Sequence, residues 1–397
     1  MNRMYKQKIL MVHNYYQIPG GEDTVFDNEK KLLEINGHDI SEYTRNNEDF
    51  ENFNLFQKMC YPLNAIFSFE TYREIKKKII EEQIDIVHVH NTWPLISPSV
   101  YYAAFRLNIP VIQTVHNFRL ICPSGTLFHK GKIFEDSLYN GLLSAIKNKV
   151  YKDSYVHTAI SAITLKIHRM LKTYRKVNFI FLTKFNKDKV LELNNNSSVF
   201  DENKTYVKPN FVIEDRKVIP YGKRKKQFVY VGRLDKTKGI DLLLHAWKDI
   251  SDYELLICGT GPEKEFCIDF IEKNHVSNIE VLGFVEHSDV LDIISESLAL
   301  ILPSQLYEGF PMTMVESFSC GTPVIGSNMG NVNDLIENGI NGYKFQFNSA
   351  KSLKEAVYNI SDMTYTCKNI FIKKYRSDIN YKQLMSIYEN IQSKEGK

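Results

Sequence analysis

Residues 298–326 decide the fold, and they read LALILPSQLYEGFPMTMVESFSCGTPVIG. The apolar run Leu298 to Leu302 is followed by a polar loop, a stretch with helical spacing, and a second apolar run that begins at Pro323. Short apolar runs that alternate with helical stretches are typical of strands buried on both faces of a parallel sheet. The segment therefore predicts a strand, a covering helix and a second parallel strand.

The same alternation runs along the whole chain in two sets. The predicted strands are Lys8 to His13, Asp85 to His90, Pro110 to His116 and Phe179 to Thr183 in the first set, and Phe228 to Val231, Glu254 to Cys258, Ile279 to Leu282, Ala299 to Leu302 and Pro323 to Gly326 in the second. This rhythm predicts the α/β class, with two doubly wound Rossmann-like domains. A helix from about Glu22 to Asn36 is expected to end at Gly37, because glycine readily takes the left-handed conformation of a helix C-cap.

The predicted domains are residues 1–212 and 213–374, followed by a C-terminal helical segment, 375–397. A polar, cationic run from Glu214 to Gln227 lies between the two sets of strands and predicts a linker. The last segment has apolar residues at helical spacing, and we expect it to pack back on the first domain.

The amino-acid composition excludes several classes of protein. The chain has 397 residues and 43% hydrophobic content, which is too apolar for a disordered protein. Its net charge of +3 argues against a strongly basic nucleic-acid binder. The charge is uneven, because residues 1–226 carry 34 Lys and Arg against 24 Asp and Glu, so this part is expected to face an acidic partner. Six dispersed cysteines and the lack of a long apolar run predict free thiols and a cytoplasmic location.

Ligands of doubly wound sheets bind beyond the carboxyl ends of the strands, so residues that directly follow strands are the candidates. In the first domain, Gly20 and Gly21 follow the first strand, and their amides with the next helix N-terminus suit an anion. The equal alternative is an ordinary loop that needs a positive φ. His116 ends another strand and either hydrogen-bonds a substrate or stays neutral in a polar network. His88 and His90 lie within a buried strand and are interpreted as structural.

In the second domain, Arg233 and Lys238 stand five positions apart in a glycine-flanked turn after a strand. Such a pair can hold a diphosphate, the arginine through its planar fork and the lysine as a point charge. The alternative for either residue alone is a solvated surface charge. Gly261 lies in the turn after the next strand, where its role is either close approach to a ligand or purely structural.

The loop within residues 298–326 is the most informative. Pro311 fits the first turn of a helix, which places Glu308 in the entering loop and Glu316 more than one turn inside. The amides of Gly309, Phe310 and their successors would point at an anion, while the carboxylates accept hydrogen bonds from hydroxyls. The alternatives are an acid stabilised by the helix dipole for Glu308 and a solvated helix residue for Glu316.

Together these motifs resemble glycosyltransferase family 4, whose members are retaining enzymes with the GT-B fold, in which two domains face each other across a cleft. The resemblance covers nearly the whole chain. It rests on Gly20-Gly21, the Gly-Arg-Leu-x-x-x-Lys-Gly turn of residues 232–239, the Gly-x-Gly-Pro turn of residues 259–262, and Glu308-x7-Glu316 followed by Cys-Gly-Thr-Pro-Val-Ile at 320–325.

A subgroup involved in bacterial surface polysaccharides is similar in three further stretches, which are Gly20 to Asp23, His116 to Arg119 and Cys122-Pro123. The chain departs from the family pattern at Asn331 and Asp334.

The resemblance implies roles for the candidates. Arg233 and Lys238 would hold the diphosphate of the donor, Glu316 its ribose, and Glu308 the transferred sugar. His116 would touch that sugar from the first domain. The implied catalytic residues are Glu308, His116, Arg233 and Lys238, and the implied donor-binding residues are Gly20, Gly21, Arg233, Lys238, Gly261, Phe284, Glu308, Gly309, Phe310, Met312, Thr313 and Glu316.

The resemblance also implies the reaction. A hexose would move with retention from a UDP- or GDP-linked donor on the second domain to a glycan or undecaprenyl-pyrophosphate-linked acceptor on the first, in capsule, exopolysaccharide or O-antigen synthesis. Neither a metal nor another cofactor is expected, and no nucleic acid. Two alternatives stay open. One is a non-catalytic partner in a transferase complex, and the other is a sugar-nucleotide epimerase or two-domain oxidoreductase, which the lack of Gly-x-Gly-x-x-Gly in the first loop disfavours.

A peripheral membrane contact is a further hypothesis. Residues 141–190 carry eleven Lys and Arg against two Asp, at Asp153 and Asp188. Apolar residues of an expected helix accompany them, namely Ile160, Ile163, Ile167 and Leu171. Basic residues near an anionic leaflet contribute about 1 kcal/mol each to binding. The first domain is therefore expected to rest on the inner face of the plasma membrane, the alternative being a solvated face over a core helix.

Overall fold

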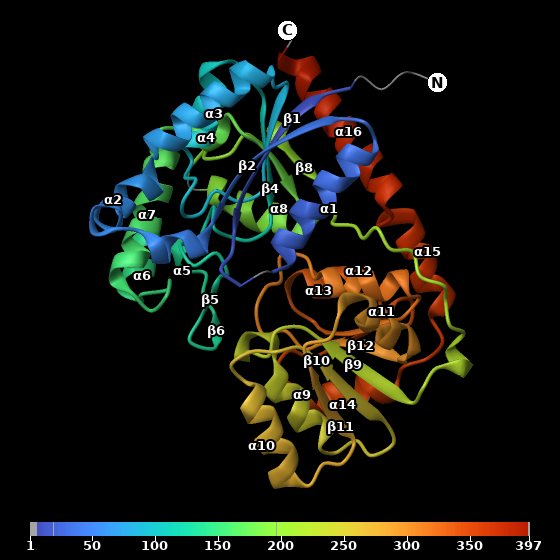
Figure 1. Ribbon diagram of the computed structural model, residues 1–397. Coiled ribbons are helices and arrows are strands. Elements are labelled where there is room, and N and C mark those ends of the chain that lie inside the picture. The colour runs from blue at the N-terminus through green and yellow to red at the C-terminus, as the bar shows by residue number, and fades with distance from the viewer. Residues whose placement is uncertain (1–5, 19, 196, 396–397) are drawn as a thin grey trace. The chain divides into compact units, whose positions relative to one another are not determined.

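The computed structural model describes residues 6–18, 20–195 and 197–395, and it divides into two compact units (Figure 1). The units are Met1–Leu127, Phe134–Pro209 and Asn380–Lys397 for the first, and Phe128–Ile133 and Asn210–Ile379 for the second. Each contains one six-stranded parallel sheet, so the predicted α/β class with two Rossmann-like domains is confirmed. The main division falls after residue 209, where the sequence placed it after residue 212. Pro19, before the glycine pair, lies outside the described residues.

The sheet of the first unit has the strand order β2-β1-β3-β4-β7-β8, with every neighbouring pair parallel. Its strands are β1 Lys8–Tyr15, β2 Asp39–Asn46, β3 Ile86–Val89, β4 Val111–Val115, β7 Asn178–Phe181 and β8 Thr205–Val207. β3 and β7 are buried along their whole length, as are all but the end residues of β1. The strand order changes direction between β1 and β3, so the loops after these strands meet where doubly wound sheets bind ligands.

The sheet of the second unit has the order β11-β10-β9-β12-β13-β14, again with parallel neighbours. Its strands are β9 Gln227–Val231, β10 Glu254–Cys258, β11 Ile279–Gly283, β12 Ala299–Leu302, β13 Val324–Ser327 and β14 Gly342–Phe345. The order reverses between β9 and β12. The loops that follow these two strands therefore lie side by side at the switch point.

Helices connect the strands in both units. Those of the first unit are α1 Gly21–Ile35, α2 Leu55–Ile66, α3 Phe69–Glu82, α4 Ser99–Arg106, α5 Asp136–Tyr139, α6 Leu142–Lys147, α7 Tyr155–Met170 and α8 Lys184–Leu191. Those of the second are α9 Ile240–Trp247, α10 Lys264–Asn274, α11 His287–Glu296, α12 Met312–Ser319, α13 Gly330–Leu335, α14 Ala350–Tyr358 and α15 Thr364–Lys374. A short antiparallel hairpin pairs β5 Phe128–His129 with β6 Lys132–Ile133.

The ends of α1 lie within one residue of the ends that the sequence predicted. The helix covers nearly the predicted range, and Gly37 has a φ of +87°, as expected for a left-handed residue beyond the C-cap. The amides of Gly37 and His38 donate back to Glu34 and Leu33 at 2.9 and 3.2 Å. This closing turn ends the helix cleanly before β2.

The C-terminal helix α16, Ser377–Glu395, lies beside the sheet of the first unit (Figure 1). It buries residues at helical spacing, namely Tyr381, Leu384, Ile387 and Tyr388. The Tyr388 hydroxyl lies 2.7 Å from Nδ1 of His88 in β3. The helix thus contributes polar groups to the interior of that unit as well as apolar surface.

Two interpretations of the sequence were wrong or incomplete. The run from Glu214 to Gln227, predicted as a linker, packs in part into the second unit, because Arg224 is buried and donates to the carbonyls of Ser297 and Gly321 at 3.1 and 3.0 Å. A guanidinium with this many carbonyl acceptors can be buried inside a domain. The strands β2, β8 and β14 also went unpredicted, because edge strands such as β2 carry polar residues instead of an apolar run.

All six cysteines are unpaired thiols, as predicted. Among the described residues, no helix combines the length and the apolar character needed to cross a bilayer. α7, in the basic region, buries Ile160 against the unit and leaves Ile163 exposed.

Candidate functional site

The loops at the carboxyl edge of the second sheet are fastened to one another by their backbones. Four amide-to-carbonyl hydrogen bonds join them, from Gly232 to Cys258 at 3.0 Å, Leu234 to Thr260 at 2.8 Å, Gly259 to Gly283 at 2.7 Å and Gln305 to Thr237 at 2.8 Å. The loops after β9, β10, β11 and β12 therefore form one surface whose shape does not depend on long side chains.

Two glycines make this close packing of loops feasible. Gly239 has a φ of +73°, and a Cβ there would lie 1.9 Å from the carbonyl oxygen of Pro303. Gly261 has a φ of +155°, and its Cβ would lie 2.3 Å from the carbonyl oxygen of Leu234. Backbone oxygens cannot move aside as the end of a flexible side chain can. The structural alternative for Gly261 therefore accounts for its presence.

The central feature of the site is an ion pair between residues 70 positions apart. Lys238 Nζ donates to both carboxylate oxygens of Glu308, at 2.7 and 2.9 Å, and the Ser304 hydroxyl donates to one of them. The Lys238 side chain is 32% exposed and that of Glu308 12%. Asp235 orients the loop by accepting from the amides of Thr237 and Lys238 at 2.8 and 3.2 Å. A lysine held in this way still has a proton free for an anion.

Arg233 shares the loop but not the ion pair. Its side chain is half exposed, and its Nε lies 3.6 Å from Asp235 Oδ2, beyond hydrogen-bond distance. Its carbonyl accepts from the Tyr230 hydroxyl at 2.8 Å, which fixes the backbone at this point. The guanidinium is thus available to a ligand, and its convergence with Lys238 on a single ligand stays a prediction.

The N-terminus of α12 directly follows the loop that contains Glu308. The helix begins at Met312, with Pro311 as its N-cap rather than inside the first turn, and no side chain caps it. The first amides of a helix lack partners within the helix, so those of Met312 and Thr313 are open to an anion. Phe310 buries its ring against Tyr375, which leaves only its backbone for a ligand.

Asn331, a departure from the family pattern, has a structural role at this site. Its buried side-chain amide donates to the carbonyl oxygens of Glu308 and Gly309, at 2.5 and 2.7 Å. It thereby ties the loop before α12 to α13. The sequence showed that Asn331 departs from the family pattern, but it did not indicate which groups the side-chain amide contacts.

Glu316 and Phe284 differ sharply in exposure. Glu316 is only 8% exposed, so the alternative of a solvated helix residue was wrong. Burial raises the pKa of its carboxyl, which His287 counteracts and Glu214 reinforces. Phe284 follows β11 with 73% of its surface exposed. An exposed phenyl ring beside the site is suited to stacking on a planar ligand.

In the first unit, the glycine pair opens α1. Gly20 is extended, with a φ of −138°, so the alternative of a turn that needs a positive φ was wrong for this residue. Its amide donates to Asp23 Oδ2 at 2.9 Å, and Asp23 Oδ1 lies 2.7 Å from His13 Nε2. Gly21 begins the helix and is exposed. Of the two, Gly21 therefore offers the freer approach to an anion.

Glu22 lies in the stretch from Gly20 to Asp23 that was named from the sequence, but no role was predicted for it. One of its carboxylate oxygens accepts from the Tyr16 hydroxyl at 2.9 Å and from the Asn117 amide at 3.2 Å. Burial raises the pKa of Glu22 to about 7, although the hydrogen bonds from Tyr16 and Asn117 oppose this. Glu22 thus connects the loop after β1 with the loop after β4.

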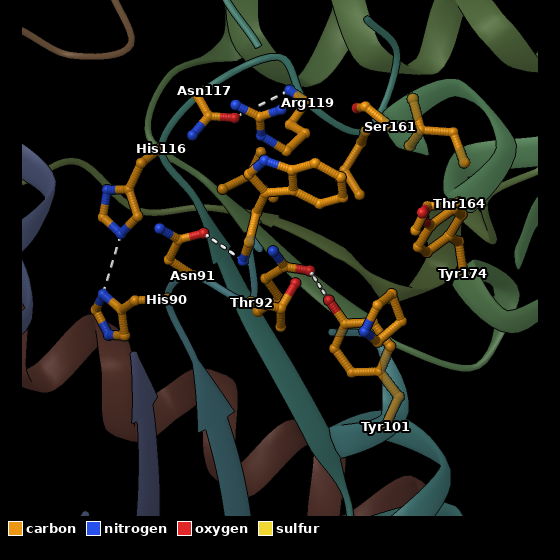
Figure 2. A pocket seen from close by; sticks show the side chains of 16 residues that line it. His90, Asn91, Thr92, Tyr101, His116, Asn117, Arg119, Ser161, Thr164 and Tyr174 are labelled. Carbon is orange, nitrogen blue, oxygen red and sulfur yellow. Dashed lines mark hydrogen bonds between the residues drawn. The ribbon is translucent and has the colours of Figure 1, made fainter. Parts of the chain in front are cut away.

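His116 lies at a small cavity in the first unit (Figure 2). Its Nε2 is 3.0 Å from Nδ1 of His90, and the two rings stack at 5.1 Å. Burial, His90 and His13 hold the pKa of His116 well below its usual range, so the ring is neutral. The cavity has a volume of about 50 Å³, which suits a few water molecules or one substituent rather than a whole sugar.

Among the described residues, one cluster has the ligand types of a metal site, namely Glu29, His88 and His90. Its ligand atoms lie within 4.8 Å of one another. Lys208 Nζ, however, is 2.7 Å from Glu29 Oε2 and already neutralises that carboxylate.

Comparison with known proteins finds a matching family model for each of the two parts of the chain. The model of the family "Glycosyltransferase Family 4" matches residues 19–177, and that of "Glycosyl transferases group 1" matches residues 212–376. An uncharacterized glycosyltransferase of Methanocaldococcus jannaschii is 25% identical over 98% of this chain and 99% of its own. An uncharacterized protein in the cps region of Klebsiella pneumoniae is 27% identical over 42% of this chain and 47% of its own. The structure of HepE from Anabaena, in complex with UDP and glucose, matches with a TM-score of 0.66 and 15% identity over 97% of this chain and 100% of that one.

Proposed function

The chain belongs to the glycosyltransferases of family 4 and has their GT-B fold, and from that premise we propose that it transfers a hexose with retention from a nucleoside-diphosphate sugar. The acceptor in this proposal is a glycan or an undecaprenyl-pyrophosphate-linked sugar of a surface polysaccharide. The protein from the cps region of Klebsiella pneumoniae supports that setting. The complex of HepE with UDP and glucose supports a nucleotide-sugar donor, here UDP- or GDP-linked.

The observation that carries the proposal is the Lys238–Glu308 pair at the switch point of the second sheet. A partly exposed ammonium, the half-exposed Arg233 and the uncapped start of α12 all offer positive charge near one loop edge. A diphosphate needs such an environment, because two adjacent phosphates are strongly anionic. Phe284 then offers its ring to the base, and Glu316 its carboxylate to the ribose.

The chemistry that follows is electrostatic. As the bond between the anomeric carbon and the diphosphate breaks, negative charge grows on the departing oxygen, and Arg233, Lys238 and the α12 amides stabilise it. The acceptor hydroxyl attacks the same face that the diphosphate leaves, and its proton passes to the leaving phosphate oxygen. Glu308 is poorly suited as a nucleophile, because both of its oxygens accept from Lys238. It instead holds Lys238 and accepts from a sugar hydroxyl.

The experiment is a donor screen with matched variants. Nucleoside diphosphates are first ranked by thermal shift, since a ligand at 100 times its dissociation constant stabilises a protein by about 2.7 kcal/mol. Sugar release and transfer are then measured with the matching nucleotide sugars. Glu308→Gln is expected to lower turnover about 10²- to 10³-fold, whereas Lys236→Met, on the same loop but exposed, retains it.

Four outcomes of these experiments are informative. Transfer with retained anomeric configuration supports the proposal, and normal turnover by Glu308→Gln contradicts the role given to this residue. Epimerised nucleotide sugar without transfer would indicate the epimerase. Donor binding without turnover, even with acceptor lipids, would indicate a non-catalytic partner.

We also propose that the first unit contacts an anionic membrane surface. α2 and α6 both pack against α7. Large apolar side chains on and beside these helices are exposed, namely Leu55, Met59, Leu63, Leu143, Val156, Ile163, Met170 and Leu171. Leu55, Met59 and Leu63 stand four residues apart on one face of α2. Apolar side chains beside a lysine-rich segment are suited to a surface of acidic lipids.

Flotation with anionic vesicles tests this contact. The protein is expected to bind the vesicles at low salt and to bind them more weakly at high salt. Replacement of Lys149, Lys152 and Lys166 together by Gln is expected to reduce the binding at low salt. Absence of flotation at low salt would contradict the proposed membrane contact.

A further inference from the structure

A chain of buried polar groups runs through the first unit to His116, starting at an ion pair. Glu29, on α1, places Oε2 2.7 Å from Nζ of Lys208, and this ammonium also donates to Asn380 Oδ1 at 2.9 Å. Both side chains of the pair are almost wholly inaccessible to solvent. Burial raises the pKa of Glu29, but the ammonium of Lys208 outweighs it, and the pKa lies well below its usual range. The carboxylate is therefore ionised and can only accept hydrogen bonds.

The second oxygen of Glu29 faces two imidazoles. Oε1 lies 3.2 Å from His88 Nδ1 and 3.3 Å from His90 Nε2. His88 has other partners, the hydroxyls of Tyr388 and Thr114 at 2.7 and 2.8 Å. Nε2 of His90 and Oε1 of Glu29 are both buried without a well-aligned hydrogen-bond partner among the described residues, so the 3.3 Å contact between them is electrostatic. A nitrogen that faces a buried carboxylate is most stable with its proton, so His90 carries its proton on Nε2.

The proton on His90 Nε2 determines the other ring nitrogen. We take His90 as singly protonated, and such a ring has one N–H donor and one acceptor, so its Nδ1 is then the acceptor. That atom lies 3.0 Å from Nε2 of His116. Figure 2 draws this contact between the two rings as a dashed line. His116 must then donate from Nε2, which leaves a lone pair on its Nδ1.

We propose that Glu29 and His90 are positioning residues that fix the tautomer of His116, so that His116 presents a hydrogen-bond acceptor to a hydroxyl of the sugar. This inference rests on the proposed function for the identity of the ligand. An acceptor accommodates a hydroxyl and repels a carboxylate at the same point. The site is therefore expected to take a neutral hexose and to discriminate against a uronic acid whose carboxylate replaces that hydroxyl.

The first test reads the tautomer directly and needs no turnover. In protein labelled with ¹⁵N-histidine, long-range ¹H–¹⁵N correlations show which nitrogen of His116 carries the proton. The wild type is expected to show a single Nε2–H form. His90→Leu, which removes the acceptor, is expected to give a mixture, while His90→Asn, whose amide keeps an oxygen for His116, is expected to restore part of the Nε2–H form.

Two further variants keep the test falsifiable if a single change unfolds the chain. Glu29→Gln with Lys208→Met removes both charges together, so no buried charge is left alone, and it is expected to release the tautomer of His116. His168→Asn is the matched control, because His168 is a buried histidine of the same unit with different partners, the Tyr102 hydroxyl and the Ile66 carbonyl. It is expected to lower stability without changing the His116 spectrum.

The second test pairs enzyme variants with deoxy donors. Removal of the hydroxyl that meets His116 is expected to slow the wild type about tenfold, as the loss of one hydrogen bond does. With His116→Phe and with His90→Leu, the transfer rate from the same deoxy donor is expected to equal the rate from the parent sugar. If both variants still react about tenfold more slowly with the deoxy donor than with the parent sugar, the proposal is overturned.

Two further results would also overturn it. One is an unchanged His116 spectrum in every variant, and the other is a stoichiometric metal ion, found by elemental analysis and lost when Glu29, His88 or His90 is changed. If no nucleotide sugar is turned over at all, the proposed function fails, while the tautomer measurement still reports on Glu29 and His90.

Discussion

The two units place polar groups at the carboxyl ends of similar sheets, but they hold them by different means. In the first, Glu29, Lys208, His88 and His90 are buried and lie in contact with one another. In the second, Lys238 and Glu308 remain accessible and are held by loops whose backbones are hydrogen-bonded together. The comparison teaches that a change in the first unit should act mainly on stability and geometry, whereas a change in the second should act mainly on ligand binding.

The largest effect is expected where a buried charge loses its partner. Lys208→Met leaves the carboxylate of Glu29 without its cation and should lower the free energy of unfolding by about 3–5 kcal/mol. Urea denaturation measures this. The double variant with Glu29→Gln should recover much of the loss, and a single variant as stable as the wild type would show that the pair is not buried as described.

The next prediction concerns the pH dependence of stability, which tests the burial of Glu22 in the first unit. Glu22 has a pKa of about 7 in the folded chain against 4.5 for the free side chain, so between these values the folded state holds a proton that the unfolded state has released. Stability should therefore fall as the pH rises from 4.5 to 7, by at most about 1.4 kcal/mol per pH unit from this group.

Glu22→Gln removes that titration while keeping the shape of the side chain. Its stability relative to the wild type should increase across this pH range and stay constant above it. Glu34→Gln, an exposed position on the same helix, serves as the control. Parallel pH profiles for Glu22→Gln and the wild type would mean that the carboxylate of Glu22 is solvated.

The smallest effect is expected in the second unit. Asn331→Ala removes the amide that holds the carbonyls of Glu308 and Gly309, and it should weaken donor affinity about five- to tenfold. Calorimetric titration with the donor measures the change. Loss of stability without loss of affinity would place Asn331 with the groups that only support the fold.

The fold was predictable because the central strands carry apolar runs that need no partner to be recognised. β10 and β12 have the bounds that the sequence indicated, and Gly37 ends α1 as expected. The edge strand β2 was missed because half-exposed strands carry mixed polar residues.

Residues of the candidate site could be proposed from the sequence only where a single loop carries a recognisable motif. Lys238 and Glu308 each stood in a recognisable motif, although their direct contact did not follow from either motif. The chain from Lys208 through Glu29 to His116 could not be predicted, because its members are far apart in sequence. Glu29, taken alone, has the pattern of an ordinary acid on a surface helix.

The most direct measurement of the central claim is calorimetric titration of UDP, GDP and their nucleosides into the wild type, Lys238→Met and Lys236→Met. The account predicts that the wild type binds one diphosphate at least tenfold more tightly than its nucleoside, that Lys236→Met keeps this difference, and that Lys238→Met loses it. Equal affinity for nucleoside and diphosphate in the wild type, or an unchanged preference in Lys238→Met, would contradict it.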